Sequence, residues 1–276
     1  MIYPYDMATA TIADSVLGQY GLAEDPFSLS PDPRFLYLTN QHKAALAKLR
    51  YVLERRQGFA VLYGDVGHGK STLIRRLFGI YRGQEAYESV LITNPDYPTA
   101  LQLLKRLTDE FGLPRRPSKL DQMQELEGHL VGRFAEDKNV LVLIDEAQMM
   151  RGDQFELIRQ ITNFESDDNK LVQIVMAGQN NLRNKLKLKR ALLSRAAAVA
   201  TLDPLTPEET ADMISFRLSV AGRHEPLFTP DALDFIYERS KGVPREAVKV
   251  CMNALAIGGM MEAELITAEV VRDSIE

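Results

Sequence analysis

The chain has 276 residues, of which 45% are hydrophobic and 26% are charged, so it can form one large core and a smaller second domain. Its net charge of −5 argues against a large nucleic-acid-binding surface but leaves room for a local basic stripe. The single cysteine excludes an internal disulfide framework, and the sequence shows neither an apolar run of about 20 residues nor a basic leader. We therefore expect a cytoplasmic protein without membrane contact.

The N-terminal part of the chain carries weak structural signals. Residues 1 to about 25 show no clear periodicity and are expected to form a tail or arm. The following segment is rich in turn-forming residues and is expected to be irregular. Residues 41–56 have the apolar spacing of a helix. We treat residues 1–58 as one N-terminal segment.

From residue 59 the chain alternates short apolar runs with helical patterns, which predicts a three-layer α/β domain with a parallel sheet. Two of the runs are almost entirely apolar, as strands buried on both faces are. The expected strands are residues 59–63, 89–93, 140–144, 171–177 and 197–202. The expected helices are residues 71–81, 99–111, 119–134, 154–163 and 182–193.

After Asp203 the strand patterns end and helix starts follow one another. Thr206-Pro207-Glu208-Glu209 combines a capping Thr, a Pro in the first turn and a Glu three residues after the cap. Further helix starts are expected at Thr229-Pro230, Pro244 and Thr267. The sequence therefore predicts an α/β core over residues 59–205 and a small, all-helical domain over residues 206–276.

A phosphate-binding loop follows the first expected strand. Gly64-Asp65-Val66-Gly67-His68-Gly69-Lys70-Ser71 matches G-x-x-x-x-G-K-[ST] at every fixed position. In this pattern the glycines let main-chain N–H groups point at a phosphate, the lysine reaches the outer phosphates and the Ser71 hydroxyl ligates Mg²⁺. The pattern also occurs by chance, but here it follows an apolar strand and opens an amphipathic helix, as the mechanism requires. We predict ATP and Mg²⁺ as cofactors, bound by these eight residues and Thr72.

Two consecutive acids end the apolar run of residues 140–144. Asp145 is expected to hold Mg²⁺, directly or through water, and Glu146 to orient and polarise the attacking water. The alternative for Asp145 is that it only caps the next turn. The acid pair favours a hydrolase over a metabolic kinase, because an attacking water needs a base beside the metal.

From about Tyr20 to Val271 the sequence resembles the AAA+ ATPases, and within them the ExeA-like group of secretion ATPases and transposition regulators of the TnsC, TniB and MuB type. The resemblance implies a P-loop AAA+ core followed by a helical lid. The segments that carry it are Tyr20-Gly21-Leu22, Pro26-Phe27, Pro31-Asp32-Pro33-Arg34-Phe35-Leu36-Tyr37, Ile144-Asp145-Glu146-Ala147-Gln148, Gly178-Gln179, Leu227-Phe228-Thr229-Pro230-Asp231-Ala232 and Gly242-Val243-Pro244-Arg245.

Three further catalytic residues are implied by the resemblance, beside Lys70 and Glu146. Gln179 occupies the sensor 1 position, where Asn or Thr is usual, so Asn180 and Asn181 stay open as alternatives. Arg195 resembles the arginine finger that enters a neighbouring subunit's site, and Arg245 matches the sensor 2 arginine, which would also contact the nucleotide. Two such cations would neutralise charge on the γ-phosphate, the alternative being ordinary surface ion pairs. A finger acting between subunits implies a homo-oligomer, either a ring or a helical filament.

The resemblance also places the segment around Pro26, Phe27, Tyr37 and His42 beside the adenine. Plain core packing is the alternative interpretation of these residues.

A basic stripe without acidic residues covers residues 180–195. Such a stripe is able to contact nucleic-acid phosphates, or it is a solvated face that meets an acidic neighbour. By resemblance, pore-facing residues of the ATPase domain track one strand of double-stranded DNA. The candidates for DNA contact are Thr99, Lys105, Lys119, Lys185, Lys187 and Lys189.

Two functions of different classes follow from the resemblance. One is a DNA-transposition regulator that oligomerises on duplex DNA with ATP and recruits or licenses a transposase or target-selection protein. The other is an ATPase of a secretion or polysaccharide-export system. Secretion members of the family typically continue into a membrane helix and a cell-wall-binding domain, and this chain ends after the helical domain, so the transposition class is expected first.

Replacing the lysine of the loop tests the phosphate assignment. Lys70→Ala removes the cation that reaches the outer phosphates, so it is expected to abolish ATP binding. The measurement is equilibrium titration of the protein with ATP and Mg²⁺. Normal ATP affinity in this variant would refute the assignment.

Overall fold

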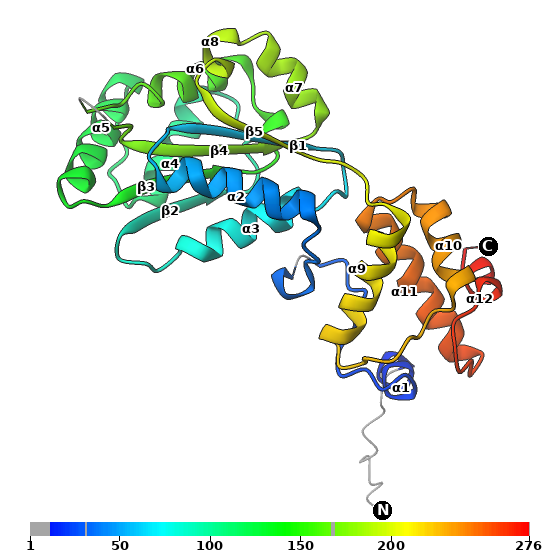
Figure 1. Ribbon diagram of the computed structural model, residues 1–276. Coiled ribbons are helices and arrows are strands. Elements are labelled where there is room, and N and C mark those ends of the chain that lie inside the picture. The colour runs from blue at the N-terminus through cyan, green and yellow to red at the C-terminus, as the bar shows by residue number, and fades with distance from the viewer. Residues whose placement is uncertain (1–11, 31, 167–168, 276) are drawn as a thin grey trace, which may run out of the picture. The chain divides into compact units, whose positions relative to one another are not determined.

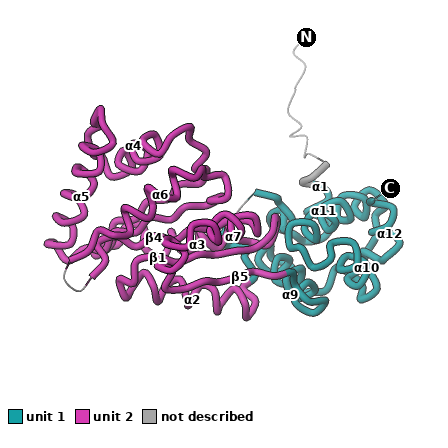
Figure 2. Tube along the Cα trace, turned by 90° about the horizontal axis from the view of Figure 1, so that it is seen from above, with its two compact units in different colours: residues 1–37, 204–276 teal, residues 38–203 magenta. Residues whose placement is uncertain are grey.

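The computed structural model describes residues 12–30, 32–166 and 169–275 (Figure 1). Residues 1–11 of the predicted arm and Pro31 of the quoted motif lie outside these ranges. The described chain forms two compact units (Figure 2). One, the α/β unit, spans residues 38–203, and the other, the helical unit, combines residues up to 37 with residues from 204 onward.

The α/β unit contains a five-stranded parallel sheet in the order β2-β3-β4-β1-β5. The three central strands are buried at every position, which explains why their sequences are almost entirely apolar and do not alternate with polar residues. Because β4 lies between β1 and β3, the carboxyl ends of these three strands meet at one edge of the sheet. The strands are β1 (Phe59–Gly64), β2 (Tyr87–Ile92), β3 (Asn139–Ile144), β4 (Val172–Gly178) and β5 (Ala196–Leu202).

Helices cover both faces of this sheet, so the unit has three layers (Figure 1). Helices α2 and α3 pack on one face, where both contact β1 and β4. Alternate strand residues such as Val61, Val142 and Ile174 form one cluster with apolar residues of α4 to α8 on the other face. The helices are α2 (Asn40–Glu54), α3 (Lys70–Tyr81), α4 (Ala100–Glu110), α5 (Lys119–Ala135), η2 (Ala147–Met149), α6 (Gly152–Ile161), α7 (Asn180–Lys187) and α8 (Arg190–Leu193).

The structure confirms the predicted fold class. All five expected strands are present, and their ends differ from the predicted ones by at most two residues. One expected helix, over residues 182–193, is instead the pair α7 and α8, because the backbone leaves helical geometry at Lys189, with φ −109° and ψ 56°. Among the described helices of both units, none is long and apolar enough to span a bilayer.

The helical unit contains the four C-terminal helices that the sequence predicts and two N-terminal elements that it does not. The capping box at the start of α9 is present, with the Glu209 N–H donating to Thr206 Oγ1 and the Thr206 N–H to Glu209 Oε2, both at 3.1 Å. A proline begins each of α9, α10 and α11. The elements are α1 (Ile12–Gln19), η1 (Pro33–Phe35), α9 (Pro207–Val220), α10 (Pro230–Ser240), α11 (Pro244–Met260) and α12 (Ala268–Asp273).

The N-terminal segment differs from the expected arm. From residue 12 it is part of the helical unit, with Tyr20, Leu22 and Phe27 buried in that unit's core. The Phe27 ring meets the Phe228 ring edge-on, with centroids 5.8 Å apart. These apolar residues follow no regular period, because turns rather than one continuous helix bring them to the core. The predicted first segment therefore divides after residue 37, and residues 38–58 belong with the sheet.

One arginine holds this N-terminal segment on α9. Arg217 donates through Nε to the Pro26 carbonyl at 2.6 Å and through its two terminal nitrogens to the Ser28 and Phe35 carbonyls at 3.2 and 3.3 Å. Its guanidinium also lies over the Phe35 ring, 5.1 Å from the centroid. Burial lowers the pKa of Arg217, because water reaches the guanidinium poorly. The three main-chain oxygens take the place of water around this cation.

Arg217→Met tests this anchoring. The variant keeps the apolar stem but leaves three carbonyls without their charged donor, so the free energy of unfolding is expected to fall by about 2–3 kcal/mol. Urea denaturation of the whole chain measures the change. Arg239→Met, at an exposed arginine of α10, is the matched control and should change stability by less than about 0.5 kcal/mol. Equal effects in the two variants would contradict the anchoring role.

Candidate functional site

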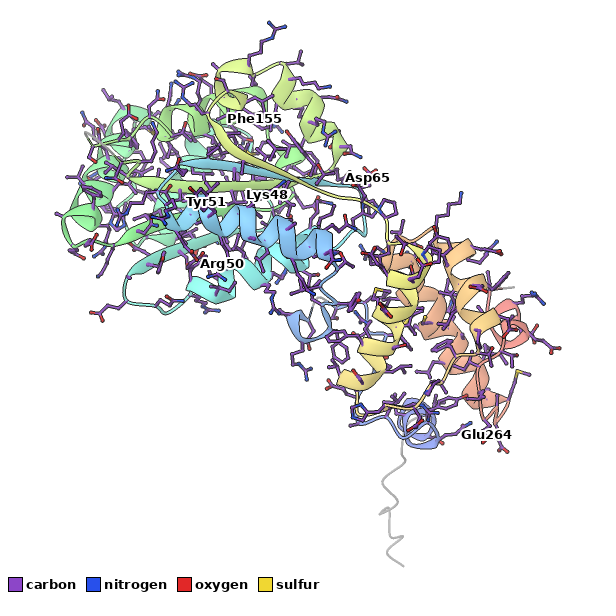
Figure 3. The ribbon with its side chains drawn as sticks, viewed as in Figure 1. Lys48, Arg50, Tyr51, Asp65, Phe155 and Glu264 are labelled. Carbon is purple, nitrogen blue, oxygen red and sulfur yellow. The ribbon has the colours of Figure 1, made fainter. Side chains whose placement is uncertain are left out.

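The phosphate-binding loop connects β1 to α3 at the carboxyl edge of the sheet, where Figure 3 shows Asp65. Gly67 and Gly69 have φ values of 84° and 83°, in the left-handed region that side chains with a Cβ rarely adopt. At Gly64 a Cβ would lie 3.0 Å from the Leu202 carbonyl oxygen. The glycines of the motif are therefore required by backbone geometry, and the loop leads directly into the N-terminus of a 12-residue helix.

Lys70 is the buried cation of the loop. Only 4% of its surface is exposed, and its ammonium donates to the Asp65 carbonyl at 2.9 Å. Burial lowers the pKa of Lys70, while the nearby charges of Glu146, Asp145 and Asp65 oppose that shift. A buried ammonium that hydrogen-bonds a main-chain oxygen inside a glycine-lined turn fits the position of a bound phosphate.

His68 has a different role in the loop from the one expected of a phosphate-binding residue. Its ring is buried, and its Nδ1 accepts a hydrogen bond from the Asp65 N–H at 3.0 Å. The side chain thus folds back and braces the start of the loop. Nucleotide binding by residues 64–72 stays a prediction.

The two predicted metal ligands lie together. The Ser71 hydroxyl hydrogen-bonds the Asp145 carboxylate, which is 5% exposed and also accepts the Glu146 N–H at 2.9 Å. Burial raises the pKa of Asp145, and these two hydrogen bonds lower it. The bond from the next residue's N–H means that Asp145 also makes the turn contact considered as its alternative role.

The donor set fits Mg²⁺. In the described part of the chain, no group of three or more His, Cys, Asp and Glu residues forms a metal site. Mg²⁺ does not need such a cage, because it keeps several waters and binds through one or two protein oxygens together with substrate phosphates. Ser71 and Asp145 supply those protein oxygens.

Glu146 is the N-cap of the short helix η2 and has a strained backbone conformation. Its φ of 49° and ψ of 34° lie in the left-handed region, which is unusual for a residue with a long side chain and is typical of functional sites. The Gln148 side-chain amide donates to the Glu146 carboxylate. Gln148 itself is 4% exposed, and its Oε1 accepts the Gln179 N–H at 3.1 Å.

The structure therefore brings the end of β4 to the acid pair. Gln179 lies directly after β4 and before α7, with a half-buried side chain, while Asn180 and Asn181 are exposed in the first turn of α7. Its sensor role stays a prediction. The residue that sequence analysis left without a role is Gln148, which was quoted only as part of a motif. The sequence signal that could have pointed to Gln148 is its polar side chain inside the motif Ile144-Asp145-Glu146-Ala147-Gln148.

The two predicted arginines belong to different units, Arg195 to the α/β unit and Arg245 to the helical unit. Arg195 donates to Asn163 Oδ1 at 3.1 Å and to the Ala191 carbonyl, so it is held on its own unit between α8 and β5. Arg245 is exposed in the first turn of α11, in the helical unit. The finger role and the sensor 2 role both stay predictions.

The residues predicted beside the adenine belong to two different units. Phe27 and Tyr37 pack in the helical unit, where the Tyr37 hydroxyl donates to Asp212 Oδ2 at 3.1 Å. His42, on α2, lies against the phosphate-binding loop, where its Nε2 is 3.2 Å from the position that a Cβ at Gly69 would occupy. Core packing thus describes Phe27 and Tyr37 in this structure, and adenine contact stays a prediction.

The candidates for DNA contact have varied surroundings. Lys185 donates to the carbonyls of Gln148 and Met150 at 2.6 and 3.1 Å, which gives it a structural role. Lys119 donates to Gln160 Oε1 at 3.0 Å, and the Thr99 hydroxyl caps α4. Lys187 is exposed, whereas Lys105 and Lys189 are half-buried.

Residues 53–186 match the protein family described as AAA domain. The chain is 39% identical over 240 residues to the general secretion pathway protein A of Aeromonas hydrophila, a match that covers 86% of this chain and 43% of that protein. It is 28% identical over 146 residues to an uncharacterized HTH-type transcriptional regulator of Methanocaldococcus jannaschii, covering 50% of this chain and 35% of that protein. The chain thus spans less than half the length of these curated relatives.

Solved structures share the fold at low sequence identity. The Aeropyrum pernix ORC2 protein, solved as ADPNP-ADP complexes, has a TM-score of 0.70 at 17% identity, covering 92% of this chain and 72% of its own. Cdc6p from Pyrobaculum aerophilum has a TM-score of 0.69 at 18% identity, covering 92% of this chain and 70% of its own. The Thermotoga maritima RuvB Holliday junction branch migration motor has a TM-score of 0.53 at 17% identity, covering 84% and 68%. Residues 53–186 are therefore similar to an AAA domain, and the chain has the P-loop AAA+ fold of these structures.

The buried acid makes a prediction about stability. Asp145→Asn is expected to increase the free energy of unfolding of the nucleotide-free protein at pH 7, because it removes the charge whose burial raises the pKa of Asp145. An acid with a raised pKa binds more protons in the folded state, so folded stability falls as pH rises through the window that begins near the unfolded value of about 3.9. The gain should therefore shrink as pH is lowered.

Urea denaturation without nucleotide, at pH 7 and at about pH 4, checks this expectation. Asp96→Asn, at an exposed aspartate, is the control and should show little change at either pH. A less stable Asp145→Asn variant at pH 7 would show that the lost hydrogen bonds outweigh the relieved burial.

Proposed function

We propose that this AAA-domain protein binds ATP with Mg²⁺ and hydrolyses it, and that it does so as the ATPase of a secretion system. The observation that supports hydrolysis best is the convergence of Lys70, Ser71, Asp145 and Glu146 at one sheet edge. The support for the secretion role is the 39% identity to a general secretion pathway protein over 86% of this chain.

The residues of the site divide the work of hydrolysis. Main-chain N–H groups of the loop and the Lys70 ammonium bind the β- and γ-phosphates and stabilise the charge that develops during transfer. Ser71 and Asp145 would hold Mg²⁺, which when bound neutralises charge on the phosphate oxygens. Glu146 orients the attacking water and accepts its proton.

Three further residues would contact a nucleotide from outside this cluster. Gln179 would contact the γ-phosphate, since it follows β4 at the shared edge. Arg245 would reach the nucleotide from the helical unit. Arg195 would act on the nucleotide of a neighbouring subunit, which requires the protein to assemble into a ring or filament.

The similarity to a general secretion pathway protein supports the secretion role better than the transposition role that was expected first. Sequence analysis placed a transposition regulator first, partly because the chain ends after the helical domain. That reason does not hold, because the chain spans 43% of the general secretion pathway protein it matches. DNA binding stays as the second candidate because exposed Lys187 and Arg190 flank Leu188, which is 85% exposed at the turn between α7 and α8.

Glu146→Gln tests the proposed activity and separates the two candidates. The variant keeps the phosphate-binding loop but lacks the base, so it should bind ATP normally and lose at least about 100-fold in turnover. Lys70→Ala is the control that binds no ATP. Normal turnover in Glu146→Gln would contradict the assignment of the base.

The same variant, held in its ATP-bound form, is then titrated with duplex DNA at two salt concentrations. The secretion role predicts no nucleotide-dependent binding. Tight binding that requires ATP and weakens steeply with salt would instead support the DNA-binding candidate.

A further inference from the structure

We propose that Gln148 is a positioning residue for ATP hydrolysis, which holds the Glu146 carboxylate and ties it to the end of β4. This inference rests on the proposed hydrolytic function, because its effect is on the base of that reaction.

Both the oxygen and the nitrogen of the Gln148 side-chain amide make hydrogen bonds. A backbone N–H can only donate, so the Gln179 N–H, 3.1 Å away, requires the amide oxygen of Gln148 to face β4. The amide nitrogen then faces Glu146, to whose carboxylate it donates. A neutral donor bound to an anion is among the stronger hydrogen bonds of a protein, so this contact restricts where the carboxylate points.

The other buried glutamines of the described chain show what a purely structural glutamine does. Gln122, Gln154 and Gln173 also accept a main-chain N–H through Oε1, but their amide nitrogens donate to main-chain carbonyls or to a hydroxyl. Among these four, Gln148 is the one that donates to a carboxylate, and that carboxylate is the predicted base, Glu146.

The surroundings hold Gln148 in place. At Gly178, the last residue of β4, a Cβ would lie 2.8 Å from Gln148 Oε1 and 2.7 Å from Leu182, so only glycine leaves room for this arrangement. The Lys185 ammonium binds the Gln148 carbonyl at 2.6 Å and the Met150 carbonyl at 3.1 Å, which fixes the main chain of η2. A side chain braced in this way can hold a second residue at a defined angle.

The bridge has a mechanical consequence for the site. Gln179 is the first residue after β4, and its main-chain N–H is linked through one side chain to Glu146. Any shift of the β4 end when a γ-phosphate is bound therefore changes the support of the base. Glu146 also lies close to the phosphate position, since among the charges acting on Lys70 it has the largest opposing effect on that lysine's lowered pKa, which burial causes.

The experiment compares two substitutions at Gln148 with a matched control. Gln148→Met has a similar size and removes both hydrogen bonds. Gln148→Glu keeps an acceptor for the Gln179 N–H but places an anion beside Glu146. Gln173→Met removes a buried glutamine of β4 whose amide also makes two hydrogen bonds. It accepts one from the Gly58 N–H and donates one to the Lys170 carbonyl.

Three quantities are measured: steady-state ATP turnover, the Kd of a non-hydrolysable ATP analogue, and hydrogen exchange of the Gln179 amide in the nucleotide-free protein. Both Gln148 variants should lose about 10- to 100-fold in kcat with Kd changed by less than about 3-fold. Gln173→Met should keep its kcat at temperatures where it is folded. The Gln179 amide should exchange faster in Gln148→Met and stay protected in Gln148→Glu.

Other results would overturn the inference. Native kcat in both Gln148 variants would show that the base needs no such support. Native kcat in Gln148→Glu alone would mean that the bond to Gln179, and not the bond to Glu146, matters. An equal loss in Gln173→Met would indicate general destabilisation. Native protein that hydrolyses no ATP would contradict the proposed function itself, and this is measured before any variant.

Discussion

The burial of opposite charges at one edge of the sheet is the interaction on which this site depends. Only 4% of the Lys70 surface and 5% of the Asp145 surface are exposed. Burial lowers the pKa of Lys70 and raises the pKa of Asp145, so it favours the neutral form of each side chain. Such an arrangement costs folding free energy, because each ion loses its hydration and gains only partial compensation from its neighbours. A triphosphate and a divalent cation would supply opposite charges to both groups, so part of this cost would be recovered as binding free energy.

The sheet order explains why these charges meet. The loop follows β1, the acids follow β3, and β4 separates the two strands, so the carboxyl end of β4 lies between the ends that carry the loop and the acid pair. Gln148, on η2, accepts the Gln179 N–H and donates to the Glu146 carboxylate, so it joins Glu146 to the end of β4. The carboxyl ends of three strands thus support one site. In this way a parallel sheet brings residues from distant parts of the chain within hydrogen-bond reach of one another.

Much of this arrangement could be predicted from the chain itself. The central strands are buried on both faces, so their runs are almost entirely apolar, and the loop needs glycines at positions of positive φ that no other residue supports well. Gln148 could not be assigned a role, because one of its two partners, Gln179, is 31 residues away and only the tertiary structure brings the two together. The N-terminal segment was misjudged because Tyr20 and Phe27 reach the core through turns, which leave no period in the sequence.

The path of the chain between its two units has a consequence for synthesis on the ribosome. The helical unit begins before residue 38 and resumes at residue 204, so the whole α/β unit is inserted into it. During translation the apolar side chains of Tyr20, Leu22 and Phe27 emerge first but have no core to join until α9 to α11 follow. The α/β unit can complete its sheet before these helices are synthesised, which makes it the first part of the nascent protein able to fold.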